Sequence, residues 1–370
     1  MKPIRLILCL LLFPLTIWYA VGVAIRNLYY SLHNIQNSNA VRANSGDSRS
    51  PVTIGIGNLR MGGTGKTPHT EYLVRLLQSP GFVSVPSVAL LSRGYGRKTK
   101  GFLLADNSHQ TSDTTHRTSD ITHLLGDEPA MMARKFPDLT VAVCEDRQEG
   151  IRRLMQLPRP PRIVLLDDVY QHRRVKPTLN ILLTEYGDPF FRDHILPFGN
   201  LREFRSGRRR ADIVVVTKCP SHLSNSEREQ FRRKLRLSPK QQLFFSSISY
   251  QPFQPLYGRG QWQSVDEILL VTGIANPTPL QRHLGQSAAV TLLRYPDHHR
   301  FSPGDCRKIL DTFNALASPA KAVVTTEKDA LRLLAPSIAG MLDKLPVFYI
   351  PVKVEFLEDD SFNQTIKKNL

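Results

Sequence analysis

A glycine-rich segment followed by a lysine is the part of the sequence best suited to hold a phosphate. The segment at 59–68 reads LRMGGTGKTP and follows an apolar run at 52–58, VTIGIGN, which is typical of a short buried strand. Glycines let a backbone come close to an anion and turn its N–H groups toward it. The residues of the predicted cradle are Gly62, Gly63, Thr64 and Gly65.

The two residues after the glycines supply the charge and the hydroxyl that nucleotide binding needs. Lys66 can reach the β- and γ-phosphates, and the hydroxyl of Thr67 can bind Mg²⁺. An amphipathic helical pattern follows, and the N-terminus of such a helix favours an anion. One position departs from the usual phosphate-binding loop, because Arg60 stands where the first glycine is expected. The segment therefore predicts a variant phosphate loop that binds ATP.

Paired carboxylates occur at two further places. The apolar run RIVLLDD at 162–168 ends in Asp167 and Asp168, which would place carboxylates beside Mg²⁺ or its water shell. The block GDEP contains Asp127 and Glu128, and on an extended backbone neighbouring side chains point in opposite directions, so they could take different roles. The alternative for this second pair is the start of a helix, where acidic residues stabilise the first turn.

Apolar runs at regular intervals provide the elements that would position these groups. Helical patterns lie between many of the runs, and this alternation predicts the α/β class with doubly wound, mostly parallel sheets. We expect a phosphate-loop NTPase-like domain at 34–245, a connector at 246–264 and a smaller α/β domain at 265–345. A strand returning alongside the connector and a tail would occupy 346–370. The expected strands lie at 52–58, 87–92, 139–144, 162–168, 179–185, 212–218, 267–273, 322–328 and 346–352.

The first 33 residues predict a hydrophobic helix that associates with a membrane. Residues 6–25 carry no charge, Arg26 follows them, and twenty helical residues would just cross a hydrocarbon core of about 30 Å. A single span, a helix lying in the interface and a cleaved signal peptide are the three alternatives. Residues 34–50 are polar and are expected to be a linker.

Composition restricts the class of partner. The 370 residues are 41% hydrophobic and 22% charged, which excludes wholesale disorder, and the formal net charge of +17 favours an anionic partner. Aromatic residues are not interleaved with the basic runs, as a single-strand nucleic-acid platform would require, so no nucleic-acid partner is expected.

The four cysteines are too far apart in sequence for a zinc motif and are expected to be reduced thiols. The repeat TSDTTH and TSDITH within 98–125 is expected to be a polar surface insertion rather than a metal site.

Ten short blocks together resemble the tetraacyldisaccharide 4′-kinases, the lipid A 4′-kinases of Gram-negative envelopes. The blocks run in family order across most of the chain, although Arg60, Val169 and Tyr170 and the long insertion at 98–125 depart from the family pattern. They are GNLRMGGTGKTP, SRGYGR, GDEP, EDRQEG, LDDVYQHRR, LPFGNLRE, RRADIVVVTK, VTGIANP, YPDHH and TTEKDA.

The resemblance implies transfer of the γ-phosphate of ATP to the 4′-hydroxyl of a tetraacyldisaccharide 1-phosphate, which gives lipid IVA. It also implies ATP and Mg²⁺ as cofactors, a catalytic body on the cytoplasmic face of the inner membrane, and no obligate protein partner. Asp127 would be the base near the acceptor hydroxyl, Glu128 would lie near the metal, and His298 would pair with Asp127. Because His298 lies in the expected second domain, the active site would form in the cleft between the domains and closure would complete it.

Further residues of the same blocks are expected to contact substrate. An arginine-rich run from 202 to 210 could bind the 1-phosphate or anionic headgroups, and its alternative is a solvated basic loop. The expected substrate residues are Arg93, Tyr95, Gln171, His172 and Arg202.

Two other functions fit parts of the sequence. A membrane-associated partitioning or targeting ATPase also carries GGTGKT, but it has a signature lysine where this chain has Met61. A nucleic-acid-binding module would explain the charge alone.

Overall fold

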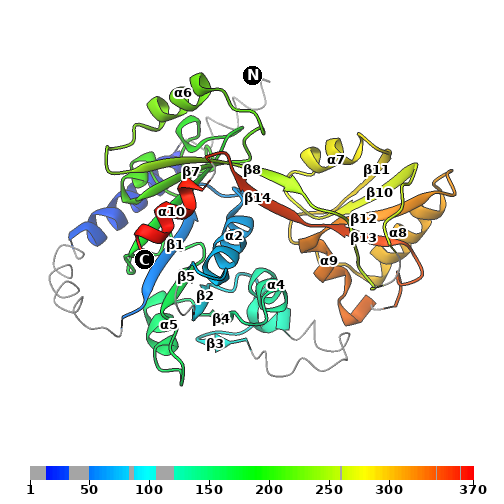
Figure 1. Cartoon of the computed structure of the whole chain (residues 1–370), viewed down its shortest axis with the longest axis horizontal. Helices are drawn as coiled ribbons and strands as arrows, with labels where there is room; N and C mark the ends of the chain where they lie inside the picture. The colour runs from blue at the N-terminus through cyan, green and yellow to red at the C-terminus, as the bar shows by residue number, and fades with distance from the viewer. Residues whose placement is uncertain are drawn as a thin grey trace.

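The computed structural model describes residues 14–32, 50–82, 87–105, 121–258, 261–338, 340–358 and 360–370. Figure 1 shows a larger lobe and a smaller lobe joined by a pair of strands. The N-terminal hydrophobic segment is described only from residue 14, and the repeat in the 98–125 insertion lies mostly outside the described residues. Within these ranges no helix is both long and apolar enough to cross a bilayer.

The larger lobe is built on a mixed sheet in the order β14-β8-β7-β6-β1-β5-β2-β4-β3. All neighbours are parallel except the two edge pairs, β3 with β4 and β14 with β8. The central strands are buried on both faces, which is why they read as near-continuous apolar runs. The strands are β1 (Val52–Asn58), β2 (Val88–Ser92), β3 (Leu103–Leu104), β4 (Thr140–Val143), β5 (Ile163–Leu166), β6 (Leu179–Glu185), β7 (Ile213–Thr217), β8 (Gln242–Tyr250) and β14 (Val352–Phe356).

Helices cover both faces of this sheet. Apolar side chains of α2 (Lys66–Gln78), α4 (Asp127–Lys135) and α10 (Ser361–Lys368) share one core with the strands. On the other face α5 (Arg147–Leu154) and α6 (Asn225–Leu235) each close a separate core. Two short 3-10 turns, η1 (Phe190–Arg192) and η2 (Arg205–Arg210), complete the lobe.

The smaller lobe repeats this α/β arrangement in the strand order β11-β10-β12-β13-β9. Its helices α8 (Pro303–Asn314) and α9 (Glu327–Leu333) pack on one face, and α7 (Thr278–Leu284) packs on the other. A short turn, η3 (Pro336–Ile338), lies beside α8. The strands are β9 (Gln254–Pro255), β10 (Glu267–Thr272), β11 (Ala289–Arg294), β12 (Lys321–Thr326) and β13 (Val347–Ile350).

The chain passes between the lobes along β8 and β14. The first half of β8 pairs with β7, and its second half, Ser246 to Tyr250, pairs antiparallel with the C-terminal strand β14. The expected connector at 246–264 therefore begins inside a strand. The strand β11 was not expected; one of its six positions is buried, two are half-buried and three are exposed.

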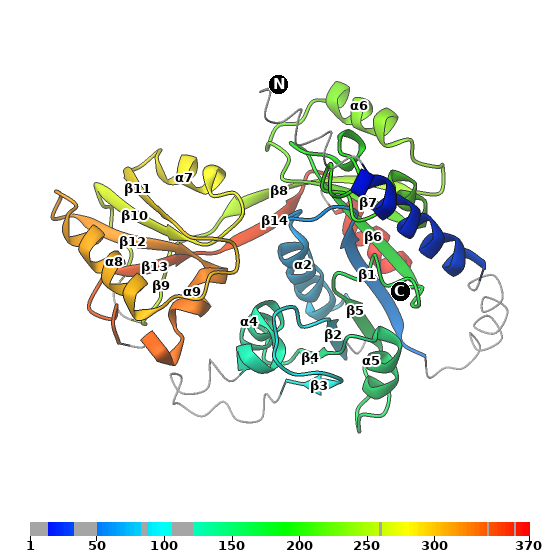
Figure 2. The same cartoon turned by 180° about the vertical axis from the view of Figure 1, so that it is seen from behind.

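Helix 14–32 lies along the outside of the larger lobe, away from the smaller one, and is dark blue in Figure 2. One face of it carries large exposed apolar side chains, among them Trp18, Ile25 and Leu28. The opposite face contacts the body through Val23, which is buried, and through Tyr19, whose hydroxyl donates to the Arg202 carbonyl at 3.0 Å.

Candidate active site

The glycine loop joins β1 to α2 as the sequence predicted, and polar contacts hold its shape. Asn58 Nδ2 donates to Thr64 Oγ1 at 2.7 Å, and Thr217 Oγ1 donates to the Thr64 carbonyl at 2.9 Å. Gly62 and Gly65 have positive φ angles of 106° and 86°, a conformation that favours glycine. The loop is thus held open in front of the first turn of α2.

Arg60 does not occupy the phosphate cradle. Its side chain is buried and turned toward the segment after β6, where Nε lies 2.7 Å from Asp193 Oδ2 and Nη2 pairs with Asp188. The departure from the usual loop sequence is therefore compatible with phosphate binding, because the arginine side chain points away from the cradle and pairs with Asp188 and Asp193.

Asp167 and Asp168 lie beside the loop because β5 is the parallel neighbour of β1. Lys66 Nζ is 3.7 Å from Asp168 Oδ1. Arg202 donates to both oxygens of the same carboxylate, from Nη2 to Oδ1 at 3.0 Å and from Nη1 to Oδ2 at 3.2 Å. Burial acts to raise the pKa of Asp168, but Lys66 and Arg202 outweigh it and hold that pKa below its ordinary value.

Asp167 has the opposite electrostatic balance. Burial raises its pKa to about 7, and the neighbouring carboxylates of Glu128 and Asp168 act in the same direction. Its remaining contacts are weak, with Ser92 Oγ at 3.4 Å and Thr70 Oγ1 at 3.5 Å. A cluster of carboxylates with this excess of negative charge suits a divalent cation, and the charge of the cation would lower the pKa of Asp167 again. Among the described residues, however, no cluster of three or more ligands is already arranged around a metal position.

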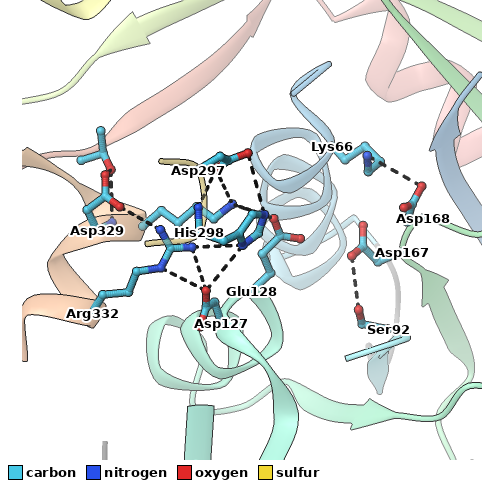
Figure 3. A network of polar contacts seen from close by, with 12 residues as sticks. Lys66, Ser92, Asp127, Glu128, Asp167, Asp168, Asp297, His298, Asp329 and Arg332 are labelled. Atoms are coloured by element: carbon cyan, nitrogen blue, oxygen red, sulfur yellow. Dashed lines mark hydrogen bonds and ion pairs between the residues drawn. The ribbon is translucent and has the colours of Figure 1, made fainter. Parts of the chain in front are cut away.

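Asp127 is the first residue of α4 and meets the smaller lobe there. Arg332 of α9 donates to its Oδ2 from Nη2 at 2.7 Å and from Nε at 3.0 Å, and His298 Nδ1 lies 3.7 Å from the same oxygen. Partial burial acts to raise the pKa of Asp127, but the imidazole of His298 and the charge of Arg332 hold that pKa well below its ordinary value. Figure 3 shows this group on one side and Lys66 with Asp167 and Asp168 on the other.

Glu128 lies between the two groups. Its Oε1 is 3.6 Å from Lys328 Nζ, and its charge acts on Asp167. The backbone at Asp127 and Glu128 is not extended, so that expectation was wrong. Both residues are helical and follow Gly126 at the N-terminus of α4. They diverge because successive residues of a helix differ by about 100° around its axis.

His298 is held in place from several sides. It has a positive φ of 60°, its Nδ1 lies 3.2 Å from Arg332 Nη2, and its Nε2 lies 3.2 Å from Lys328 Nζ. The exposed ring of Tyr95 lies 5.6 Å from the imidazole, centroid to centroid. The expected pairing of Asp127 with His298 across the lobes is therefore present, and Tyr95 adjoins it.

The other expected substrate residues are placed differently. Arg93 is exposed near Arg147 and His172, on which its charge acts. Gln171 Nε2 donates to the Asn58 carbonyl at 2.7 Å and to Glu203 Oε1 at 2.9 Å. Burial lowers the pKa of His172 to about 4, so the imidazole is neutral at pH 7.

The arginine-rich run is not a free basic loop. Arg210 pairs with buried Glu203 at 2.8 Å, Arg205 Nη2 donates to the Asp193 carbonyl at 2.6 Å, and Arg208 reaches the Arg236 carbonyl. Most of these guanidinium groups are therefore engaged within the protein.

Sequence reasoning missed two arginines. Arg147 is buried, and it donates from Nη1 to the Cys144 carbonyl at 2.7 Å and from Nη2 to the Asp167 carbonyl at 3.0 Å, which fixes the backbone of the acidic pair. Arg332 follows Asp329 by three residues, and that helical spacing was the available signal, since Nη1 lies 2.9 Å from Asp329 Oδ1. The cysteines Cys144, Cys219 and Cys306 are free and buried.

Comparisons with known proteins agree with this geometry. The chain is 40% identical to the tetraacyldisaccharide 4′-kinase of Parabacteroides distasonis over 97% of this chain and 94% of that protein. It is 41% identical to the enzyme of the same name from Flavobacterium johnsoniae over 97% and 98%. The crystal structure of LpxK from Aquifex aeolicus in complex with ATP matches 98% of this chain and 99% of its own, with a TM-score of 0.67 and 25% identity. The family model described as tetraacyldisaccharide-1-P 4′-kinase matches residues 8–370, and the chain belongs to that family.

Proposed function

We propose that this chain transfers the γ-phosphate of ATP to the 4′-hydroxyl of a tetraacyldisaccharide 1-phosphate and thereby forms lipid IVA. The single observation that carries the proposal is the convergence of two groups of side chains from two lobes. A lysine and two aspartates stand at the glycine loop, and an aspartate with a histidine stands opposite them. Family membership supplies the acceptor, and the LpxK structure with ATP supports the donor.

The residues of the glycine loop hold the donor in this proposal. The loop amides and Lys66 bind the β- and γ-phosphates, and the N-terminus of α2 faces the same anion. Thr67, Glu128, Asp167 and Asp168 are the oxygen ligands available to Mg²⁺, which would neutralise charge on the transferring group. Arg202 keeps Asp168 in place beside Lys66.

Asp127 receives the proton of the acceptor hydroxyl. The transition state of phosphoryl transfer is loose in most analyses, so the hydroxyl loses its proton late, when its acidity has already risen. A carboxylate with a low pKa can act at that stage, provided that it is correctly oriented. Arg332 and His298 supply the orientation, and both belong to the smaller lobe.

The apolar face of helix 14–32 brings the enzyme to its acceptor. Trp18 is 76% exposed, Ile25 is 63% and Leu28 is 62%, which is a large apolar area to leave in water. We place this face in the inner membrane, with the catalytic body on the cytoplasmic side. Replacing Trp18 and Ile25 by glutamate is expected to abolish co-flotation with phospholipid vesicles, and unchanged flotation would contradict the placement.

The test of the activity uses purified protein, ATP, Mg²⁺ and a tetraacyldisaccharide 1-phosphate in detergent micelles. We expect a lipid product heavier by one phosphate, with the new group on the 4′-oxygen, and no product when Mg²⁺ is chelated. ATP turnover that requires DNA or a protein, with no lipid product, would instead favour the partitioning ATPase.

A further inference from the structure

Helix 14–32 is attached to the loop that follows the acidic pair. Arg173 Nη1 donates to the Asn27 carbonyl at 2.9 Å and to Asn27 Oδ1 at 3.0 Å, and Arg173 Nη2 donates to Ser31 Oγ at 3.3 Å. Arg173 is five positions after Asp168, so at most about 18 Å of extended chain joins the junction to this neighbour of Lys66. The junction thus connects the lipid-facing helix to the reaction centre.

Guanidinium groups gather at this junction without matching acids. Nε and Nη2 of Arg26 are buried and have no hydrogen-bond partner in the described part of the chain, and the same is true of Nε of Arg173. Burial lowers the pKa of Arg173, and the charges of Arg210 and Arg26 act in the same direction. The nearby carboxylate is Glu203, which is already paired with Arg210 at 2.8 Å. Arg173 thus has two guanidinium groups acting on it, and among the described residues the carboxylate that opposes them is already paired.

An unpaired, partly buried guanidinium is costly unless an anion binds to it. The net charge of Arg26, Arg173, Arg210 and Glu203 is about +2, which would balance the charge of about −1.5 to −2 on a phosphate monoester. Arginine forks also match phosphate oxygens in geometry. The exposed apolar face of the same helix restricts the source of that phosphate to a molecule that lies in the membrane.

We propose that Arg26 and Arg173, with Arg210 behind them, bind a phosphate group carried by a lipid at the junction of helix 14–32 and the body. Such a phosphate is present on the acceptor at the end away from its reacting hydroxyl, and it is also present on anionic lipid headgroups. We assign the site to the acceptor's 1-phosphate, because the junction leads through the loop after Asp168 to the nucleotide. This assignment rests on the proposed function.

Arg174 provides a matched control on the same loop. It is exposed, its Nη1 lies 3.4 Å from Asp146 Oδ2, and Tyr30 and Asp146 both act to raise its pKa, so it already has an acidic partner. Replacing Arg174 removes one positive charge from the same segment and leaves Arg26, Arg173 and Arg210 of the proposed site in place.

The experiment compares acceptors with and without the 1-phosphate in neutral detergent micelles. We expect the wild-type protein to prefer the 1-phosphorylated acceptor. Arg26→Gln should raise KM for that acceptor about tenfold or more, the loss of one charge-assisted contact. It should leave kcat and the KM for the 1-hydroxyl acceptor unchanged. Arg26→Lys should restore part of the preference, and Arg174→Gln should leave it intact.

Three results would overturn the assignment. If Arg26→Gln raises KM equally for both acceptors, the side chain only docks the helix.

A second arm uses vesicles of phosphatidylcholine with or without phosphatidylglycerol. If the Arg26 effect requires the anionic lipid and is indifferent to the 1-phosphate, the site binds headgroups. Absence of lipid phosphorylation by wild-type protein in every arm would overturn the proposed function itself, whereas intact turnover without an Arg26 effect overturns only this site.

Discussion

Arg332 contacts one oxygen of Asp127 and leaves the other available. Its Nη2 and Nε both donate to Oδ2, at 2.7 and 3.0 Å, and the His298 imidazole approaches that same oxygen. In the described part of the chain no side chain donates to Oδ1. Positive charge is therefore concentrated behind the carboxylate, and the opposite oxygen is the one that can accept a proton from a hydroxyl group.

Arg332 also neutralises Asp329, which is fully buried, so its replacement has two separable effects. Arg332→Gln should destabilise the protein by about 3 kcal/mol, because a buried carboxylate loses its cation. It should also lower kcat by at least tenfold. The double variant Arg332→Gln with Asp329→Asn should recover much of the melting temperature but not the rate. Recovery of both would show that Arg332 serves the fold alone.

Lys66 should be required for the donor and dispensable for the fold. Lys66→Met is expected to lower activity by orders of magnitude and to weaken ATP binding measured by calorimetry. The melting temperature should change little, because Arg202 still holds Asp168. Lys218→Met is the control, since Lys218 is an exposed lysine paired with Glu185 at 3.2 Å. Wild-type affinity for ATP in Lys66→Met would remove the lysine from its assigned role.

Gly126 places Asp127, and its φ of 90° together with its close packing should not tolerate a side chain. A Cβ at this position would lie 2.7 Å from the Tyr95 carbonyl oxygen. Gly126→Ala should therefore destabilise the protein by about 1–3 kcal/mol and lower the transfer rate. Gly304→Ala should be neutral or stabilising by up to about 1 kcal/mol, because Gly304 is helical and its added Cβ would meet only Ser302 Oγ at 3.6 Å. Equal stability changes would contradict this account.

His69 should make stability depend on pH. It is buried in α2 between the Gly65 carbonyl at 2.7 Å and Ser246 Oγ at 2.9 Å, and burial lowers its pKa from 6.5 to about 4. The folded state thus binds its proton less tightly than the unfolded state does. The resulting stabilisation is complete above pH 6.5 and is lost as the pH falls toward 4.

The comparison variant for this effect is His69→Gln, which keeps a polar side chain of similar reach. Between pH 7.5 and 4.5 the wild-type protein should lose about 2.5 kcal/mol more unfolding free energy than the variant. Chemical denaturation at the two pH values measures the difference. Identical losses in the two proteins would mean that His69 is readily protonated in the folded state.

The sequence was sufficient to predict the elements with strong local signals. The strands 52–58 and 179–185 were located to the residue, since both are apolar runs that end in polar residues. The second half of β8 was assigned to a connector, because its segment carries aromatics, prolines and glycines without a helical period. Its pairing depends on β14, about 100 residues later.

The parts of the site that resisted prediction depend on long-range contacts. The pairing of Asp127 with Arg332 joins residues 205 positions apart, and nothing local to either residue specifies it. Arg60 looked like a defect of the glycine loop until its partners, more than 120 residues later, were placed beside it. The unpaired nitrogens of Arg26 become visible only when helix 14–32 lies against the body.

Single-turnover transfer by the Asp127→Asn variant tests the central claim most directly, namely that the two lobes together form one phosphoryl-transfer site. The measurement follows γ-phosphate-labelled ATP into tetraacyldisaccharide 1-phosphate with enzyme in excess, while ATP binding is recorded on the same protein. We predict unchanged ATP affinity, an unchanged melting temperature and a transfer rate lower by about 10²- to 10⁴-fold, the usual contribution of a positioned base. Transfer at the wild-type rate with ATP bound would contradict the account.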